Sequence, residues 1–212
     1  SGSKRQIEDK IFRQKTPTVK EYAEKWLYMQ SAHVRYTTML DYTSKVKNYI
    51  IQPLGDMYLA DVTQDDIKMA LVPVSKKSES VYHSVVMLLK CIFYSAEDNY
   101  LIRESPTKRI PSRGGIPEKE KPPLTDEQVE MLWDVIKGLP PYVFVMLGLY
   151  AGLRREEILG LKWDCVFLDD EVPYLSVKRA WHTEHNRPVV SDQLKTKALR
   201  RDILFLMRES DI

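Results

Sequence analysis

The stretch AGLRREEILGLKW, residues 151–163, places four charged side chains in a row between apolar segments. The preceding segment, YVFVMLGLY (142–150), contains no charged residue at all. Gly152 can adopt the positive φ that commonly ends a helix, so the pattern predicts a helix break there and a new helix starting near Arg154. The arginine is therefore expected beside backbone N–H groups that have no acceptor within their own helix.

Two interpretations of Arg154 are open from its position. A guanidinium beside free N–H groups forms a pocket for an anion with several oxygens, such as a phosphate. Glu157, one helical turn further on, can hold the guanidinium in place through an (i, i+3) pair. Alternatively, the Arg154–Glu157 pair only joins two helices.

The rest of this second domain combines helices with strands. TDEQ (125–128) is a capping box that predicts a helix start, and an apolar helix follows it before the charged stretch. The segments 174–181, 188–194 and 202–206 alternate in the manner of strands, and we expect three short strands of one antiparallel sheet.

The first domain reads as four helices between about residues 18 and 100, enough for a small bundle with its own core. TVKE (18–21) is another capping box, and apolar residues at helical spacing follow it. The second helix ends before Pro53, the third starts at Thr63, and the fourth runs to about Ala96.

Residues 103–123 differ from both neighbours, since they hold five of the 12 prolines and six basic residues. Proline keeps such a segment extended. A path along phosphates and a solvated hinge fit this composition equally well. The predicted organisation is an N-terminal extension (1–17) whose Ser1-Gly2-Ser3 is a cloning remnant, a helical domain (18–102), this linker (103–123) and a second domain (124–212).

Composition adds weak constraints. The net charge is only +2, yet residues 1–121 carry an excess of five positive charges, and so do residues 174–208. Such clustering fits a polyanionic partner, and it also fits ordinary solvated faces. No apolar stretch approaches the roughly 20 residues of a membrane span. Cys91 and Cys165 are expected to be buried free thiols, which fits a cytosolic protein without a membrane partner.

Gly152, Leu153, Arg154 and Glu157, with Leu161 and Trp163 after them, resemble the first arginine box of the tyrosine recombinase (phage integrase) family. The domain plan is similar to that of integrases from phages and conjugative transposons. The resemblance implies a mainly α fold with a small antiparallel sheet. A four-helix SAM-like core-binding domain would be followed by part of an α+β catalytic domain.

The resemblance also implies a mechanism. Such enzymes cut one DNA strand with a tyrosine, form a 3′-phosphotyrosine link and transfer it to a new strand. Arg154 matches an arginine that holds the scissile phosphate, and Glu157 matches the acidic residue that follows it. QLKTKALRRDI (193–203) resembles the hairpin whose lysine protonates the leaving oxygen, which points to Lys195, with Lys197 as the alternative.

The family's later elements do not follow Lys195 before the sequence ends at Ile212. These are a His-x-x-Arg box, a further His or Trp, and the nucleophilic tyrosine. The chain is therefore expected to be an N-terminal portion that binds DNA and does not cleave it, and a preceding arm-binding domain is an open question. Two alternatives stay open: a non-catalytic DNA-binding regulator derived from an integrase, and a helical interaction module.

Double-stranded DNA is the expected partner, and the complete protein is expected to act as a homotetramer on DNA. Candidate DNA contacts are polar or basic side chains at the start of the fourth helix, elsewhere on the second and fourth helices, and beside the strands of the second domain. They are Lys45, Lys47, Lys76, Lys77, Ser78, Ser80, His83, Lys90, Lys178, Arg179, Arg200 and Arg201. No cofactor is expected. No metal site is expected either, because His182 and His185 lack a second pair of ligands.

Overall fold

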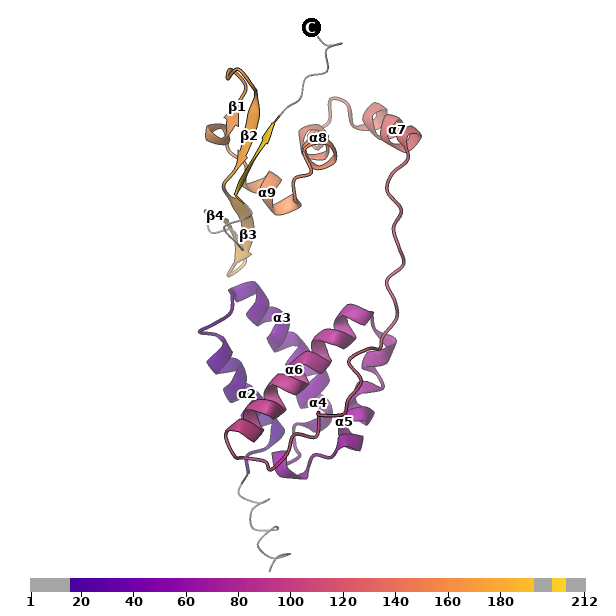
Figure 1. The fold of residues 1–212 in the computed structure, drawn as a ribbon, viewed down its shortest axis with the longest axis vertical. Helices are drawn as coiled ribbons and strands as arrows, with labels where there is room; N and C mark the ends of the chain where they lie inside the picture. Colours follow the sequence, from indigo (N-terminus) through magenta and orange to yellow (C-terminus); the bar gives the residue numbers. More distant parts are fainter. Residues whose placement is uncertain (1–15, 193–199, 205–212) are drawn as a thin grey trace, which may run out of the picture. The chain divides into compact units, whose positions relative to one another are not determined.

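The computed structural model describes residues 16–192 and 200–204, and its chain divides into two compact units between Lys121 and Pro122 (Figure 1). The fold is mostly helical with small antiparallel sheets, which confirms the fold class predicted from the sequence. No helix within the described ranges is long and apolar enough to cross a membrane.

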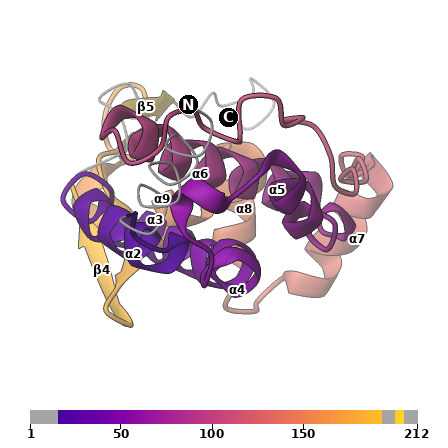
Figure 2. The same ribbon diagram turned by 90° about the horizontal axis from the view of Figure 1, so that it is seen from below.

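The first unit is a helical bundle around its longest helix. Its elements are α2 (Val19–Gln30), α3 (Tyr36–Val46), a π-helical turn (Lys47–Ile51), α4 (Gln52–Leu54), a short 3-10 turn (Leu59–Asp61), α5 (Gln64–Leu71), a second 3-10 turn (Val74–Lys76) and α6 (Glu79–Asp98). Helix α6 packs against α2 and α3, and α4 and α5 complete the bundle (Figure 2).

The helix starts lie where the sequence predicts them. Thr18 caps α2 in a reciprocal capping box with Glu21, and Thr63 caps α5 in the same way with Asp66. Each box satisfies two backbone N–H groups that the helix itself leaves without acceptors. The second helix does not end before Pro53 as expected. After a π-helical turn that the sequence did not indicate, the helical segment continues through Pro53 to Leu54, because proline is tolerated in the first turn of α4, and it ends at Gly55.

The core of the first unit is extensive. Every helix of the bundle contributes buried side chains, and the fully buried ones include Val19, Ile50, Ile67, Leu88 and Phe93. Cys91 of α6 is exposed, so the expectation that both cysteines are buried was wrong for this one. It lies one residue from the buried face of α6, since Ile92 and Phe93 take the inward positions.

The segment after α6 packs on the first unit, so the structure differs from a linker that begins at residue 103. Ser105 and Thr107 are buried and share a side-chain hydrogen bond of 2.8 Å. Ile110 is part of the core cluster, and Lys90 Nζ donates to Ser112 Oγ at 2.9 Å. The segment packs on the first unit because the buried hydroxyl groups of Ser105 and Thr107 hydrogen-bond to each other and Ile110 packs into the core.

Residues 112–116 form a strap across the start of α6, and we keep this name for them. Ile116 donates its N–H to the Lys77 carbonyl at 2.7 Å and accepts from the Glu79 N–H at 2.9 Å. Gly115 has a φ of +92°, and a Cβ there would lie 2.8 Å from Glu79 Cα. Only glycine therefore allows the strap to lie this close to the helix start.

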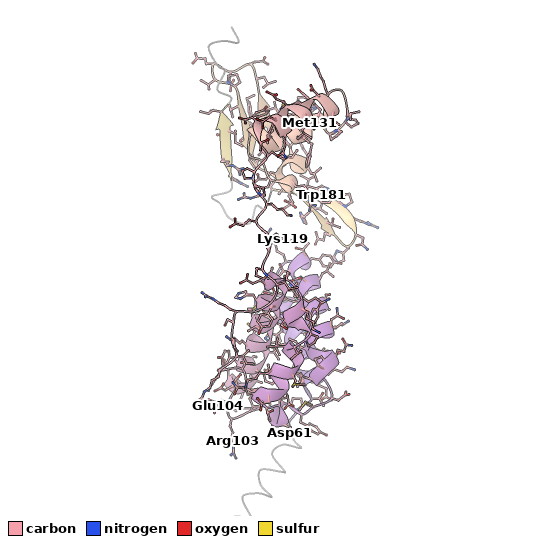
Figure 3. All side chains as sticks on the ribbon, turned by 90° about the vertical axis from the view of Figure 1, so that its right-hand side faces the viewer. Asp61, Arg103, Glu104, Lys119, Met131 and Trp181 are labelled. Carbon is pink, nitrogen blue, oxygen red and sulfur yellow. The ribbon has the colours of Figure 1, made fainter. Side chains whose placement is uncertain are left out.

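After the strap, an extended segment leads to the second unit. Lys119 lies on it (Figure 3), and Thr125 caps the next helix. At about 3.3 Å per extended residue, the path from Ile116 to Thr125 can span roughly 30 Å. The effective tether is therefore much shorter than the predicted linker.

The second unit combines helices and strands. Its elements are α7 (Asp126–Ile136), α8 (Tyr142–Tyr150), α9 (Arg155–Gly160), a 3-10 turn (Trp163–Cys165), β1 (Val166–Phe167), β2 (Tyr174–Val177), β3 (Ala180–Glu184), β4 (Arg187–Ser191) and β5 (Arg201–Leu204). The capping box at the start of α7 is present, with Gln128 reaching back to Thr125.

The strands form two sheets, so the prediction of one three-stranded sheet was wrong. β2 lies between β1 and β5, antiparallel to both, whereas β3 pairs with β4 alone. The predicted strand 174–181 is interrupted at Lys178 and Arg179, and His185 and Asn186 adopt positive φ in a two-residue turn. Such a turn pairs the two strands it joins. Residues 193, 194, 205 and 206 of the predicted strands lie outside the described residues.

Within the part of the chain that the structure describes, the second unit buries far fewer apolar side chains than the first. Its described core cluster consists of Leu147, Leu153, Leu175 and Val177. Helix α8 is apolar on all sides, yet among its described residues only Leu147 is buried, and Val143 and Tyr150 are largely exposed. A helix of this composition is ordinarily covered on every side.

This difference in buried apolar side chains predicts that the two units unfold separately, the second more readily than the first. We expect backbone amides of α6 to exchange with solvent at least about tenfold more slowly than those of α8, because each additional buried large apolar side chain contributes about 1.5–3 kcal/mol. Hydrogen exchange followed by mass spectrometry measures both helices in one sample. Equal protection of the two helices would contradict the expectation.

A second prediction concerns the strap. Gly115→Ala adds a Cβ in a left-handed backbone and against Glu79, so we expect the strap to detach and the amides of Ile116 and Glu79 to exchange at least tenfold faster. Gly138→Ala is the matched control, because its φ is +79° but no atom lies within 4 Å of the added Cβ. Unchanged exchange at Ile116 in the Gly115 variant would show that the strap is not held by this contact.

Candidate functional site

The charged stretch forms the junction between α8 and α9. Gly152 has a φ of +61° and ends the first of these helices, as the sequence predicts. Leu153 is buried, and its N–H reaches the Leu147 carbonyl at 3.3 Å. Arg154 then takes an extended conformation as the N-cap residue of α9. The buried leucine thus anchors the junction beside the arginine.

Glu157 is the centre of the site. Its side chain is only 4% exposed, and its two oxygens accept four hydrogen bonds. Oε2 accepts the backbone N–H of Arg154 at 2.9 Å and Arg201 Nη2 at 2.9 Å. Oε1 accepts Arg154 Nη1 at 3.2 Å and Arg201 Nη1 at 3.0 Å. Four hydrogen bonds fill the acceptor capacity of a carboxylate.

The two arginines differ in how much of them remains available. Arg201, on β5, binds both carboxylate oxygens in the side-by-side geometry typical of strong Arg–carboxylate pairs and is 33% exposed. Arg154 uses one guanidinium nitrogen on Glu157 and is 62% exposed. Arg201 therefore joins α9 to the sheet, and Arg154 extends outward from the junction.

The charge of Glu157 follows from these contacts. Burial by itself raises the pKa of this carboxyl, but the hydrogen bonds from the Arg201 guanidinium and the Arg154 backbone outweigh burial and hold the pKa below its usual range. The same pair raises the pKa of Arg201. Glu157 is therefore ionised at neutral pH, and the two cations are held around a fixed negative charge.

The start of α9 is not the pocket of free N–H groups expected from the sequence. The helix has only six residues, and Glu156 in its first turn accepts from its own N–H and from Arg155 Nη2 at 2.9 Å, which lowers the pKa of Glu156. An acidic side chain thus occupies the helix start. Any anion bound here would depend on the Arg154 guanidinium.

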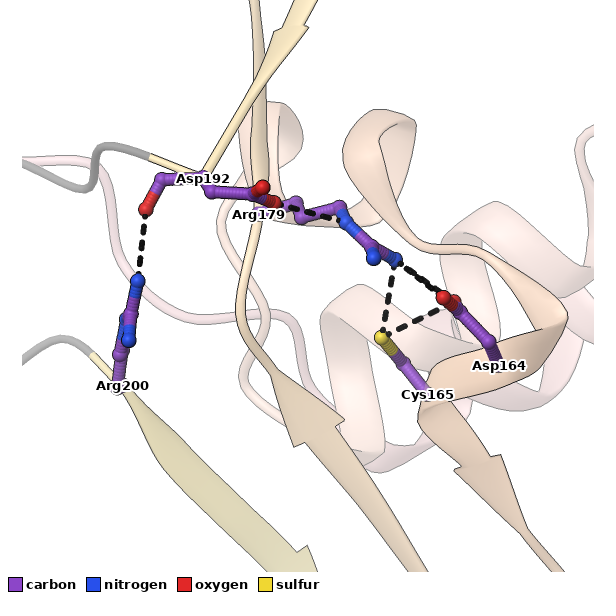
Figure 4. A network of polar contacts seen from close by, with 5 residues as sticks. All are labelled: Asp164, Cys165, Arg179, Asp192 and Arg200. Atoms are coloured by element: carbon purple, nitrogen blue, oxygen red, sulfur yellow. Dashed lines mark hydrogen bonds and ion pairs between the residues drawn. The ribbon is translucent and has the colours of Figure 1, made fainter.

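The cations near the strands are largely engaged within the unit (Figure 4). Arg179 bonds Asp164 at 2.7 Å and Asp192 at 2.9 Å, and both contacts raise the pKa of Arg179 above its usual value. Arg200 donates to the Asp192 carbonyl at 3.2 Å. Lys178 lies 5.5 Å from the centre of the Phe167 ring. Arg179 and Arg201 thus have structural partners that the sequence did not reveal.

In the first unit, exposed candidate residues gather around the start of α6. Lys76 and Lys77 precede the helix, Ser78 caps it by accepting from the Val81 N–H at 3.4 Å, and Ser80 and His83 follow, all exposed. The Glu79 N–H is not free for an anion, because the strap accepts it. The lysine and histidine side chains are therefore the groups available to a partner there.

The remaining candidates of the first unit differ in availability. Lys47 is exposed, whereas Lys45 pairs with Asp41 at 2.6 Å and Lys90 bonds Ser112. The predicted proton donors Lys195 and Lys197 lie outside the described residues. No group of three or more His, Cys, Asp or Glu side chains among the described residues is arranged to hold a metal ion.

One glycine of the site was not recognised from the sequence. A Cβ on Gly160 would lie 2.9 Å from both Ala180 Cα and Trp181 N, so the glycine lets α9 pack directly on β3. Nothing local signals this role, because the contact joins residues 20 positions apart. The same holds for Arg201, which the sequence assigned only to an outside partner.

Three comparisons with known proteins agree. Residues 18–71 match the model of the phage integrase N-terminal SAM-like domain. An integrase of Streptomyces ambofaciens is 22% identical over 155 residues, which are 71% of this chain and 39% of that protein. The Tn1549 transposon integrase in complex with circular intermediate DNA superposes with a TM-score of 0.74 at 21% identity, covering 92% of this chain and 62% of the other.

A lambda integrase tetramer bound to a Holliday junction has a TM-score of 0.66 at 18% identity, over 82% of this chain and 50% of that one. The chain therefore spans about 39–62% of the length of these relatives. The matches confirm the resemblance to tyrosine recombinase integrases that the charged stretch indicated.

The burial of Glu157 predicts a pH-dependent stability. Because its folded pKa is lowered, the stabilisation is present above the unfolded pKa and is lost as the pH falls through the folded pKa. We expect Glu157→Gln to lower the free energy of unfolding of the second unit by about 2–3 kcal/mol at pH 7, and by less near pH 3, where the unfolded carboxyl is mostly protonated. Urea denaturation at both pH values measures this.

Glu156→Gln is the control for this experiment, since that side chain is 45% exposed and its arginine partner, Arg155, is 70% exposed. Its effect should stay within about 0.5 kcal/mol. A Glu157→Gln effect of the same size at both pH values would contradict the account of a buried ionised carboxylate.

Proposed function

We propose that this chain, which has the fold of the tyrosine recombinase integrases and carries their N-terminal SAM-like domain, binds duplex DNA as part of a site-specific recombinase. The observation that carries the proposal is the exposed guanidinium of Arg154 beside a buried, ionised Glu157. The planar guanidinium of Arg154 uses one nitrogen to bind Glu157. Its other N–H groups have the geometry to donate to two oxygens of a phosphate.

Within this proposal, Arg154 binds the scissile phosphate and stabilises the negative charge that grows on it during strand cleavage. Glu157 does not touch DNA and orients Arg154 through one side-chain and one backbone hydrogen bond. Lys195 would donate a proton to the leaving oxygen. In the whole recombinase a tyrosine would form the 3′-phosphotyrosine link and rejoin the strands without an external energy source.

The first unit supplies sequence-independent contacts in this proposal. Lys76, Lys77 and His83 are exposed at the start of α6 and suit phosphates of the duplex backbone. The tether after Ile116, with its reach of roughly 30 Å, lets both units contact one duplex. Ser78 and Ser80 add hydroxyl groups at the same helix start.

The assembly and setting of the recombinase are part of the same proposal. The lambda integrase in the matched structure is a tetramer on a Holliday junction. A tetramer of the whole protein would likewise bring two duplexes together, in the cytoplasm of a bacterial host.

DNA binding by the two units can be separated by mutation. We expect Lys76→Ala with Lys77→Ala to weaken duplex binding about tenfold at 0.15 M salt and to reduce the slope of log K against log salt by about 1–2, because two phosphate contacts are lost. Arg154→Ala should change the affinity little, since it removes one contact among several. Gel-shift titrations at several salt concentrations measure both.

Lys25→Ala with Lys68→Ala is the matched control, because it removes the same charge from exposed positions on α2 and α5. This control should bind almost as tightly as the parent chain. Salt-independent binding, or equal losses in both lysine pairs, would favour a helical interaction module over a DNA-binding protein.

A further inference from the structure

Two arginines share one buried carboxylate, and they share it unequally. Arg201 places Nη1 3.0 Å from Oε1 and Nη2 2.9 Å from Oε2 of Glu157, so it uses both oxygens at once. The Arg154 side chain has a single hydrogen bond to Oε1, at 3.2 Å, the longest of the four. A bidentate pair is the stronger arrangement, so Arg201 dominates the pairing of this carboxylate.

The consequence for Arg154 follows from the cost of leaving a buried carboxylate without donors. With Arg201 in place, Glu157 has all four hydrogen bonds and engages only one guanidinium nitrogen of Arg154. Without Arg201, each oxygen loses one donor, and the nearest replacement is the rest of the Arg154 guanidinium. Arg154 would then turn onto Glu157 and present less of its fork to solvent.

We propose that Arg201 is a positioning residue, which satisfies Glu157 so that the Arg154 guanidinium stays turned outward for a phosphate. The phosphate part of this inference rests on the proposed function, whereas the orientation of Arg154 can be measured without DNA. A lysine cannot replace Arg201 fully, because an ammonium group lacks the planar fork that binds both oxygens.

The test is the rate at which an arginine-specific dicarbonyl reagent modifies Arg154, followed residue by residue with mass spectrometry. Arg201→Met should lower the modification rate of Arg154 about fivefold. One additional hydrogen bond of ordinary strength between Arg154 and Glu157 would reduce the fraction of accessible guanidinium by about this factor. Arg201→Lys should lower it by less. The double variant Arg201→Met with Glu157→Gln should restore the rate, because a neutral amide draws the guanidinium inward only weakly.

Arg179→Met is the matched control. Arg179 also bonds two carboxylates in the second unit, but these are Asp164 and Asp192 and not Glu157. Its loss should leave the modification rate of Arg154 unchanged. Circular dichroism of each variant shows whether the second unit is folded under the conditions of the reaction.

The outcomes separate this inference from the proposed function. An unchanged Arg154 rate in folded Arg201→Met or Arg201→Lys protein overturns the inference, and so does unfolding of both variants, which would make Arg201 a purely structural residue. A lowered rate that the double variant restores supports it. If the rate falls as expected but duplex DNA does not protect Arg154 in the parent chain, the positioning role stands and the proposed function fails.

Discussion

The site depends on one constraint, the burial of an ionised carboxylate at the start of a short helix. Glu157 is almost fully buried, and a charge in that position is tolerated only when every oxygen is paired. Arg201 supplies half of the pairing from a strand and the N-cap Arg154 supplies the rest. The carboxylate therefore fixes the junction of α8 and α9 relative to β5.

The same constraint separates a structural arginine from an available one. Pairs such as Arg179 with Asp164 and Asp192 hold the strand region together and leave little charge free for a partner. Arg154 is different, because most of its side chain remains exposed beside a fixed negative charge. Availability, and not the number of basic residues, is what distinguishes a phosphate-binding group here.

The two units differ in how much they rely on their own cores. The first unit buries side chains from all its helices, and the strap adds backbone hydrogen bonds across the start of α6. The second unit has a small cluster around Leu147, and its apolar helix α8 remains largely exposed among the described residues. Its tertiary order therefore depends more on polar contacts, such as those of the buried Glu157.

The sequence by itself determined the features that arise from neighbours along the chain. The capping boxes at Thr18 and Thr125, the helix start at Thr63, the break at Gly152 and the (i, i+3) pair of Arg154 with Glu157 are all local, and all are confirmed. Their hydrogen bonds link residues three or four positions apart, so the pattern alone predicts them.

Only the tertiary structure decided which distant groups meet. Arg201 binds Glu157, which lies 44 residues away in the sequence. Strand β4 pairs with β3, whereas β2 pairs with β1 and β5. Ile116 forms backbone hydrogen bonds with residues at the start of α6. Each of these contacts depends on how whole helices and strands pack together, because packing decides which charged side chains and which strand edges meet. The hydrophobic periodicity of the sequence indicates the buried face of one element, but it does not indicate which other element covers that face.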